Sequence, residues 1–131
     1  MIAPDFLSLE DVLQAHQEVI EHYGGLDGLR DQALLESAIA VPQASFGGEL
    51  VHEDLFAMAA AYAFHISQNQ PFLDGNKRTG LAAALLFLKL NEIAVKDPLS
   101  RLYDAMIAIA ERRLDKSGLA ELLQELAASI H

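Results

Sequence analysis

The segment Gln70-Pro71-Phe72-Leu73-Asp74-Gly75-Asn76-Lys77-Arg78-Thr79-Gly80 joins two long apolar stretches, and it decides the fold. Upstream, residues 55–69 contain no Asp, Glu, Lys or Arg and are rich in alanine, which favours a helix that a neighbour can approach closely. Downstream, apolar residues cover most of the circumference of a helix over about 76–91, and such a helix is buried. The sequence therefore predicts two central helices joined by a polar loop.

Four further helices are predicted outside this pair, from apolar residues at three- and four-residue steps. They cover residues 9–23, 31–39, 99–112 and 117–130. Ser8 is placed to cap the first of them, Pro42 ends the second, and Pro98 ends the linker before the third. Residues 43–52, with a Gly47-Gly48 pair, indicate an exposed loop or a short hairpin. We expect an all-α bundle of about six helices, forming one domain over residues 1–131.

The composition narrows the class of protein. The chain has 131 residues, 52% of them hydrophobic, and no cysteine, which excludes disulfides, thiolate metal sites and a thiol nucleophile. The first nine residues lack the basic residues and the apolar run of a signal peptide. The uncharged stretch over residues 55–73 contains Ser, Gln, Asn and Pro residues that a lipid-facing span would not tolerate. A cytoplasmic protein without a membrane segment is expected.

Charge is distributed unevenly along the chain. The formal net charge of -10 argues against direct binding of nucleic acid, because phosphate contacts need a basic face. Residues 1–76 contain one basic residue, Arg30, against twelve acidic ones, whereas residues 77–131 contain eight basic against seven acidic. The break falls at Lys77 and Arg78, which form either an anion site or a solvated start of a helix.

The loop at 70–80 has the chemistry of a phosphate site. The first turn of a helix offers unpaired N–H groups and positive potential, so Gly75, Asn76 and Lys77 can direct amides at a phosphate. Lys77 and Arg78 supply charge, and Asp74 can share Mg²⁺ with phosphate oxygens. Each residue also has a purely structural interpretation, with Asp74 as a cap, Asn76 as a loop residue and Pro71-Phe72 as a packing wedge. The glycine pattern of a Walker A loop is missing.

The same segment resembles the signature of the Fic/Doc family, His-Pro-Phe-x-(Asp/Glu)-Gly-Asn-(Gly/Lys)-Arg. Lys77 is similar to the Doc branch, because the Fic branch has glycine there. The likeness continues in order and spacing through residues 7–12, 23–26, 34–39, 42–48 and 82–88, so most of residues 7–125 is covered. The resemblance implies a Fic/Doc-type helical bundle.

The resemblance also implies a function and a set of roles. Asp74 would hold Mg²⁺, Gly75, Asn76 and Thr79 would line the nucleotide site, and Lys77 and Arg78 would grip the phosphates of ATP. Doc-type proteins are toxins of toxin-antitoxin pairs that transfer phosphate from ATP to a threonine of elongation factor Tu and so arrest translation. Such a toxin would be held by a separate antitoxin, whose helix lies across a groove on this domain.

Two positions depart from the family pattern. Gln70 stands where the family has its general base, and glutamine cannot take a proton from a hydroxyl, which costs about 100- to 10,000-fold in rate. Leu81 replaces the second arginine of Fic enzymes, which disfavours AMP transfer and again resembles Doc. Three functions stay open: a Doc-type kinase disabled by an inactivating change at Gln70, a Fic-type adenylyltransferase, and a non-catalytic module that binds an antitoxin or a nucleotide.

Other features give weaker signals. His16, His22 and His52 lie far from the loop in sequence, His65 lies five residues before Gln70, and none of them has metal-ligand spacing. His65 is interpreted as a packed or capping residue. Residues 43–52 are similar to the flap with which Fic proteins align a target peptide, and a plain surface turn is the alternative. Neither Ser45 nor Ser117 begins a complete inhibitory motif, so regulation should come from a separate antitoxin.

Overall fold

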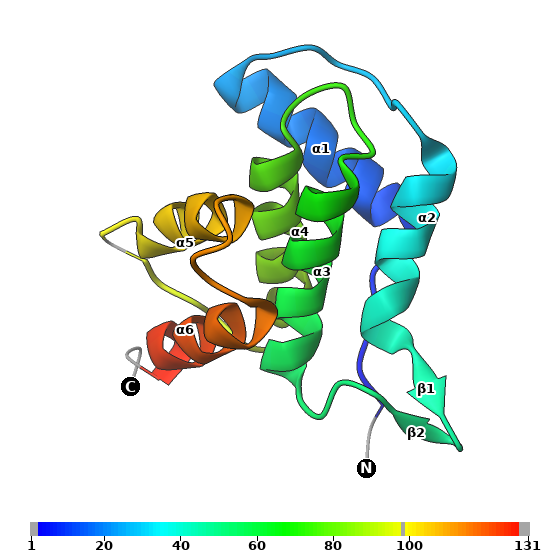
Figure 1. Ribbon diagram of the computed structural model, residues 1–131, viewed down its shortest axis with the longest axis vertical. Helices are drawn as coiled ribbons and strands as arrows, with labels where there is room; N and C mark the ends of the chain where they lie inside the picture. Colours follow the sequence, from blue (N-terminus) through cyan, green and yellow to red (C-terminus); the bar gives the residue numbers. More distant parts are fainter. Residues whose placement is uncertain (1–2, 98, 129–131) are drawn as a thin grey trace.

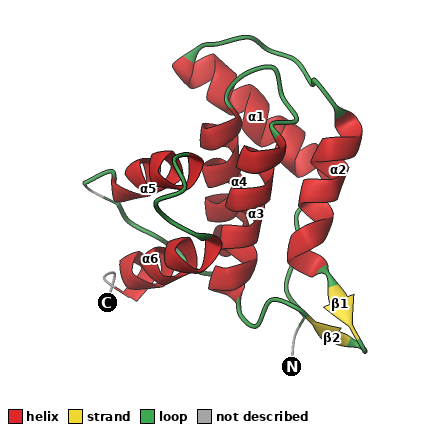
Figure 2. Cartoon of the chain, viewed as in Figure 1, coloured by secondary structure: helices red, strands yellow, loops and turns green. Residues whose placement is uncertain are grey.

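The computed structural model describes residues 3–97 and 99–128, which form six helices and one small hairpin (Figures 1 and 2). The helices are α1 (Leu9–Tyr23), α2 (Gln32–Ala40), α3 (Leu55–Asn69), α4 (Asn76–Leu90), α5 (Arg101–Ala110) and α6 (Lys116–Ala128). A 3-10 turn, Val41–Gln43, leads to strands β1 (Ser45–Phe46) and β2 (Glu49–Leu50). The predicted all-α class is confirmed. None of the described helices is both long enough and apolar enough to cross a membrane.

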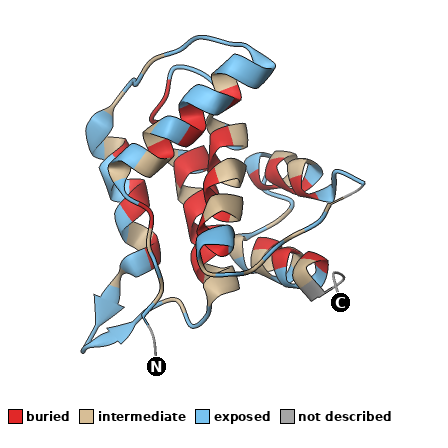
Figure 3. Cartoon of the chain, turned by 180° about the vertical axis from the view of Figure 1, so that it is seen from behind, coloured by how far each residue is buried: buried red, intermediate tan, exposed pale blue. Residues whose placement is uncertain are grey.

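Helices α3 and α4 run side by side through the centre of the molecule, where the buried residues concentrate (Figures 1 and 3). Ala59, Ala60, Ala61 and Ala63 of α3 are fully buried. Opposite them, a Cβ atom added to Gly80 of α4 would lie 2.7 Å from the carbonyl oxygen of Ala63. The alanines therefore permit the close helix contact that the sequence predicted.

The other helices cover this pair and share its core. One hydrophobic cluster receives a side chain from each of the six described helices. Representative members are Val12, Leu35, Ile66, Phe87, Leu102 and Leu119. In Figure 1, α2 lies on one side of α3, α5 and α6 lie on the other, and α1 crosses near the α3–α4 loop.

Most predicted boundaries are confirmed within one or two residues. The helix expected over 99–112 is shorter, because the Asp97 carboxylate accepts the N–H groups of Arg101 and Leu102 and so fixes the start of α5. Its C-terminal end is set by Arg112, whose φ of 61° is not helical. Pro98 and the predicted helical extension to residue 130 lie outside the described residues.

The predicted hairpin is present, but it does not lie beside the loop at 70–80. Ser45 pairs with Leu50 and Phe46 with Glu49 across the Gly47-Gly48 turn. The hairpin precedes the start of α3, whereas the loop follows its end, and the 15 residues of α3 span about 22 Å. Figure 1 shows the hairpin and the loop at opposite ends of α3. This placement favours a surface turn over a flap that aligns a target at the loop.

The contact at Gly80 leads to a prediction about stability. Gly80→Ala should lower the free energy of unfolding by about 1–3 kcal/mol, because the new methyl group meets backbone that cannot move aside easily. Alanine is the better helix former by about 1 kcal/mol, so a gain in stability is expected wherever space allows. Chemical denaturation measures the change. Gly118→Ala on α6 is the control, because its methyl group would meet the flexible side chain of Leu114. Equal stability of Gly80→Ala and the parent would contradict the close packing.

Lys116 of α6 lies close to two histidines, His65 of α3 and His52 in the segment before α3. The Nζ atom of Lys116 lies 3.0 Å from Nε2 of His65 and 3.4 Å from Nε2 of His52. Burial, and then the positive charge of Lys116, lower the pKa of His65 from 6.5 to about 4. His65 is therefore a packed residue, as the sequence indicated, and it stays neutral near neutral pH.

The lowered pKa of His65 predicts a loss of stability in acid. As the pH falls from 6.5 towards 4, His65 takes up a proton in the unfolded chain but not in the folded one, so protonation favours unfolding. The temperature of thermal unfolding should fall across this interval, and it should fall less in His65→Gln. His22→Gln serves as control, because His22 is exposed. An equally steep decline in His65→Gln would show that other groups cause it.

Candidate functional site

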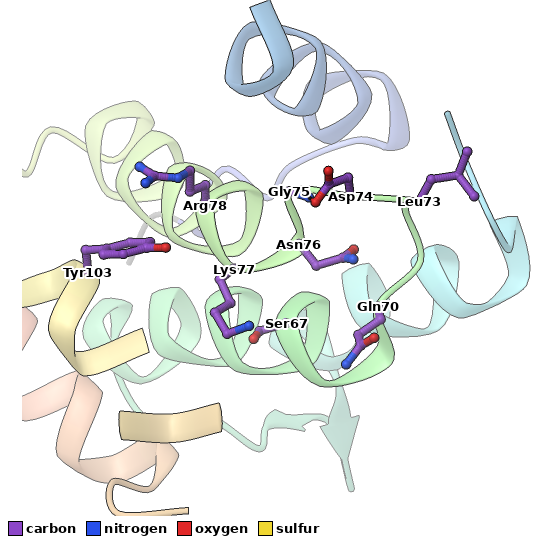
Figure 4. A pocket seen from close by; sticks show the side chains of 9 residues that line it. All are labelled: Ser67, Gln70, Leu73, Asp74, Gly75, Asn76, Lys77, Arg78 and Tyr103. Carbon is purple, nitrogen blue, oxygen red and sulfur yellow. Dashed lines mark hydrogen bonds between the residues drawn. The ribbon is translucent and has the colours of Figure 1, made fainter. Parts of the chain in front are cut away.

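The loop between α3 and α4 forms one wall of a pocket with a volume of about 340 Å³ (Figure 4). Six of the predicted site residues line it: Gln70, Asp74, Gly75, Asn76, Lys77 and Arg78. Ser67 from α3, Leu73 from the loop and Tyr103 from α5 complete the lining. Sequence reasoning missed Tyr103, because 25 positions along the chain separate it from Arg78. Thus the structure brings nearly the whole predicted set together around one hollow.

Helix α4 differs from the other five at its N-terminus. In each of the other five helices, a side chain accepts a hydrogen bond from an N–H group of the first turn. The accepting residues are Ser8 for α1, Asp31 for α2, Asp54 for α3, Asp97 for α5 and Asp115 for α6. Helix α4 begins after Gly75, which has a φ of 76° and no side chain to cap with. Within the described residues, the N–H groups of Asn76, Lys77 and Arg78 have no acceptor. Three free donors at the positive end of a helix dipole are suited to bind an anion.

The free donors begin one residue later than the sequence predicted. The N–H group of Gly75 is not available, because it donates to Oδ1 of Asp74 at 2.9 Å. Arg78 takes its place as the third donor. The predicted amide set Gly75, Asn76 and Lys77 is thereby corrected to Asn76, Lys77 and Arg78.

The Asp74 carboxylate is held by backbone donors from two segments. Oδ1 accepts from Gly75, and Oδ2 accepts from the N–H of Leu26 at 3.3 Å. A Cβ atom on Gly25 would lie 2.7 Å from Oδ2, so the approach of the two segments requires glycine there. An ionised carboxylate has about four acceptor sites, so both oxygens retain lone pairs. Asp74 is exposed and fixed in position, and it is not the side-chain cap of α4.

The Asn76 side chain closes the loop and does not point to a ligand. Its Oδ1 accepts from the N–H of Phe72 at 3.0 Å, and its Nδ2 donates to the carbonyl oxygen of Phe72 at 3.0 Å. Both ends of the amide are thus engaged. The structural interpretation of this side chain is confirmed, and Asn76 can serve a ligand through its backbone N–H.

Arg30, the one basic residue before Lys77, fastens the other side of the loop. Its guanidinium donates to the carbonyl oxygens of Gln70, at 2.8 Å, and Asn69, at 3.0 Å. These carbonyls end α3, where positive charge is stabilising. The N–H groups of Arg30 and Asp31 also donate to the carbonyl oxygen of Pro71. Arg30 therefore fixes the backbone at position 70.

His16, far from the loop in sequence, supports it from beneath. Its ring stacks on Phe72 with 3.8 Å between centroids, and its Nε2 lies 2.9 Å from the carbonyl oxygen of Asp74. Because a carbonyl only accepts, Nε2 carries the proton. Both rings are buried. No local pattern predicts this contact, because the two residues that form the hydrogen bond are 58 positions apart.

The two cations at the start of α4 have different surroundings. Lys77 is exposed and forms no ion pair within the described part of the chain. The Arg78 guanidinium lies over the rings of Tyr23 and Tyr103. Both residues line the pocket, and in Figure 4 the Lys77 side chain points toward Ser67 whereas that of Arg78 leaves α4 in a different direction.

Gln70 ends α3 in the left-handed conformation, with φ 48° and ψ 56°. Its backbone N–H donates to the carbonyl oxygen of Ile66, whereas its side-chain amide has no hydrogen-bond partner among the described residues. The amide therefore faces the pocket without a fixed role (Figure 4).

Thr79 lies apart from the other predicted site residues. It is fully buried, it does not line the pocket, and its hydroxyl has no hydrogen-bond partner within the described residues. A side chain so placed does not reach a ligand. Thr79 is therefore left out of the site that we propose.

The described side chains around the pocket do not form a complete metal site by themselves. No group of three or more His, Asp or Glu side chains able to hold a metal exists among residues 3–97 and 99–128. Among the described residues, Asp74 is the one carboxylate that lines the pocket. Mg²⁺ is commonly held by one or two carboxylates together with phosphate oxygens and water. The residues present thus fit Mg²⁺ that arrives with a polyphosphate.

Comparison with known proteins gives a consistent result. The model of the Fic/DOC family matches residues 6–88. The protein kinase doc of Escherichia phage P1 is 35% identical over 123 residues, which cover 94% of this chain and 96% of that protein. The toxin Doc of Mycolicibacterium smegmatis is 36% identical over 127 residues, which cover 95% of each chain.

Proposed function

Because this chain belongs to the Fic/DOC family, we propose that it is a Doc-like toxin of a toxin-antitoxin pair whose pocket binds ATP with Mg²⁺. The observation that carries the proposal is the start of α4, where three N–H groups lack acceptors and two cations adjoin them. The reaction that we propose from its relation to Doc proteins is transfer of phosphate from ATP to a hydroxyl group of a cytoplasmic protein. A threonine of elongation factor Tu is the target that the resemblance to Doc implies.

The proposed roles follow from the contacts. The N–H groups of Asn76, Lys77 and Arg78 would bind phosphate oxygens, and the charges of Lys77 and Arg78 would compensate theirs. Asp74, oriented by Leu26 and Gly75, would share Mg²⁺ with the phosphates. ATP supplies the phosphoryl group, and the protein supplies position and compensating charge.

Gln70 supports a second candidate, a pocket that binds nucleotide without turnover. A general base must accept a proton from the target hydroxyl, and an amide cannot do so near neutral pH. The other titratable groups that line the pocket are Asp74, Lys77, Arg78 and Tyr103. The cations cannot act as a base, and the lone pairs that Asp74 retains are the ones proposed to hold Mg²⁺. We therefore propose that the chain with Gln70 binds ATP but transfers phosphate very slowly.

Leu81 favours phosphate transfer over AMP transfer. Fic enzymes use an arginine at this place as a second phosphate clamp, and here the side chain packs against the hydrophobic core. In the part of the chain that the structure describes, one arginine, Arg78, lines the pocket. This arrangement supports the Doc-type reaction, with adenylylation as the alternative.

A separate antitoxin is the proposed partner. Neither Ser45 nor Ser117 starts an inhibitory motif in this chain, and the relative from Mycolicibacterium smegmatis is named a toxin, which supports a paired antitoxin. We propose that an antitoxin helix occupies a groove on the bundle and blocks access of the target.

Calorimetric titration of the chain with ATP tests the proposal. We expect Mg²⁺-dependent binding at one site, without release of ADP over the same period. Asp74→Asn should abolish the Mg²⁺ dependence while leaving weaker binding of free ATP. Absence of binding, with or without Mg²⁺, would overturn the proposed function.

A further inference from the structure

The Arg78 guanidinium contacts two tyrosine rings that come from helices other than its own. Its Cζ atom lies 3.9 Å from the ring centroid of Tyr23, at the end of α1, and 4.4 Å from that of Tyr103 on α5. A cation within about 6 Å of a ring centroid is attracted by the electron-rich face of the ring. The contacts thus join α1, α4 and α5 beside the pocket.

Because its partners are aromatic rings, Arg78 keeps its N–H donors and its charge available for a ligand. No N–H group of Arg78 has an acceptor, and no carboxylate pairs with it, within the described residues. A carboxylate partner would occupy these donors and neutralise the charge. Tyrosine rings attract the guanidinium without accepting its in-plane N–H groups. Arg78 is therefore oriented, and its donors and charge remain available.

We propose that Tyr23 and Tyr103 are positioning residues that hold Arg78 ready to donate to the phosphates of a nucleotide in the adjoining pocket. The inference rests on the proposed function and names the device that serves its phosphate site. Tyr103 lines the pocket together with Arg78, and it is half-buried. Tyr23 is 58% exposed. Because water weakens a cation–π contact, Tyr103 should contribute more than Tyr23.

Affinity measurements on Tyr103 variants test the inference. Tyr103→Leu should bind MgATP about three- to tenfold more weakly than the parent, as loss of one cation–π contact implies. Tyr103→Phe keeps the ring and should stay within about twofold of the parent. Tyr23→Leu, at an exposed position where folding is little affected, should show a smaller loss in the same direction. Thermal unfolding verifies that each variant is folded.

Titration with tripolyphosphate distinguishes an effect of Tyr103 on phosphate binding from a direct contact of Tyr103 with the nucleobase. Tripolyphosphate lacks a nucleobase, so its affinity should fall in Tyr103→Leu by the same factor as that of MgATP. A loss confined to MgATP would mean that Tyr103 contacts the base, and it would overturn the inference. Equal affinity of Tyr103→Leu and the parent for both ligands would overturn it as well.

A spectroscopic readout shows the contacts without any ligand. In the parent, the Hδ protons of Arg78 should be shifted upfield by the ring currents, and the shift should shrink in Tyr103→Leu. An unshifted Arg78 in the parent would contradict the positioning. If the parent binds neither MgATP nor tripolyphosphate, the proposed function fails and the phosphate part of this inference fails with it. If the parent binds both ligands and Tyr103→Leu binds them with the same affinity as the parent, the inference alone is overturned.

Discussion

Replacing Gln70 by histidine is expected to raise the rate of phosphate transfer by about 100- to 10,000-fold and to make expression of the chain toxic. Imidazole can accept the proton of a target hydroxyl near neutral pH, which the amide cannot. The backbone at position 70 is already fixed by Arg30 and adopts the left-handed conformation, which histidine tolerates better than most residues. The new ring should therefore enter the pocket without rearrangement of the loop.

ATP labelled at the gamma position, incubated with elongation factor Tu, measures the gain. Gln70→Asn is the matched control, since asparagine also tolerates the left-handed conformation but provides no base. Label that arrives only from the alpha position would support adenylylation. If Gln70→His binds MgATP but transfers label from neither position, the site is not the catalytic centre that we propose.

The second large effect is expected at Arg78. Arg78→Ala should weaken MgATP binding by about 10- to 100-fold, because charge-assisted hydrogen bonds contribute about 1.5–3 kcal/mol each. The loss should shrink as salt concentration rises, because screening weakens the parent more than the variant. Calorimetric titrations at two salt concentrations measure both effects.

Arg113→Ala is the control for net charge in this experiment. Arg113 is exposed, pairs with Glu111 and lies outside the lining of the pocket. The variant loses the same charge and should bind MgATP like the parent. A comparable loss in both variants would mean that the overall charge of the chain, and not the start of α4, governs binding.

The fold could be predicted largely from local patterns. Ser8, Asp31 and Asp54 each cap the helix that follows, so three helix starts were encoded by residues close in sequence. Helix α5 is two residues shorter at each end than expected, because Asp97 caps from outside the expected span and Arg112 turns the chain. The position of the hairpin could not be predicted, since it depends on how α2 and α3 pack.

For the site, the sequence predicts which loop residues line the pocket, but it does not predict the contacts that fix this loop in place. The loop residues are consecutive, so their proximity followed from the chain itself. His16, Arg30 and Tyr103 come from other helices and loops, and only their packing brings them to the loop. The roles of Asn76 and Thr79 were assigned from the motif, whereas hydrogen bonding and burial decide what their side chains can reach.

The proposed phosphate site depends on the free N–H groups at the start of α4, and nuclear magnetic resonance can observe them one by one. On addition of MgATP, the amide resonances of Asn76, Lys77 and Arg78 should shift together, with a single apparent affinity. The capped first turn of α2, over residues 32–34, should not move. Unchanged resonances at the start of α4 in a chain that binds MgATP would place the nucleotide elsewhere and would contradict the account.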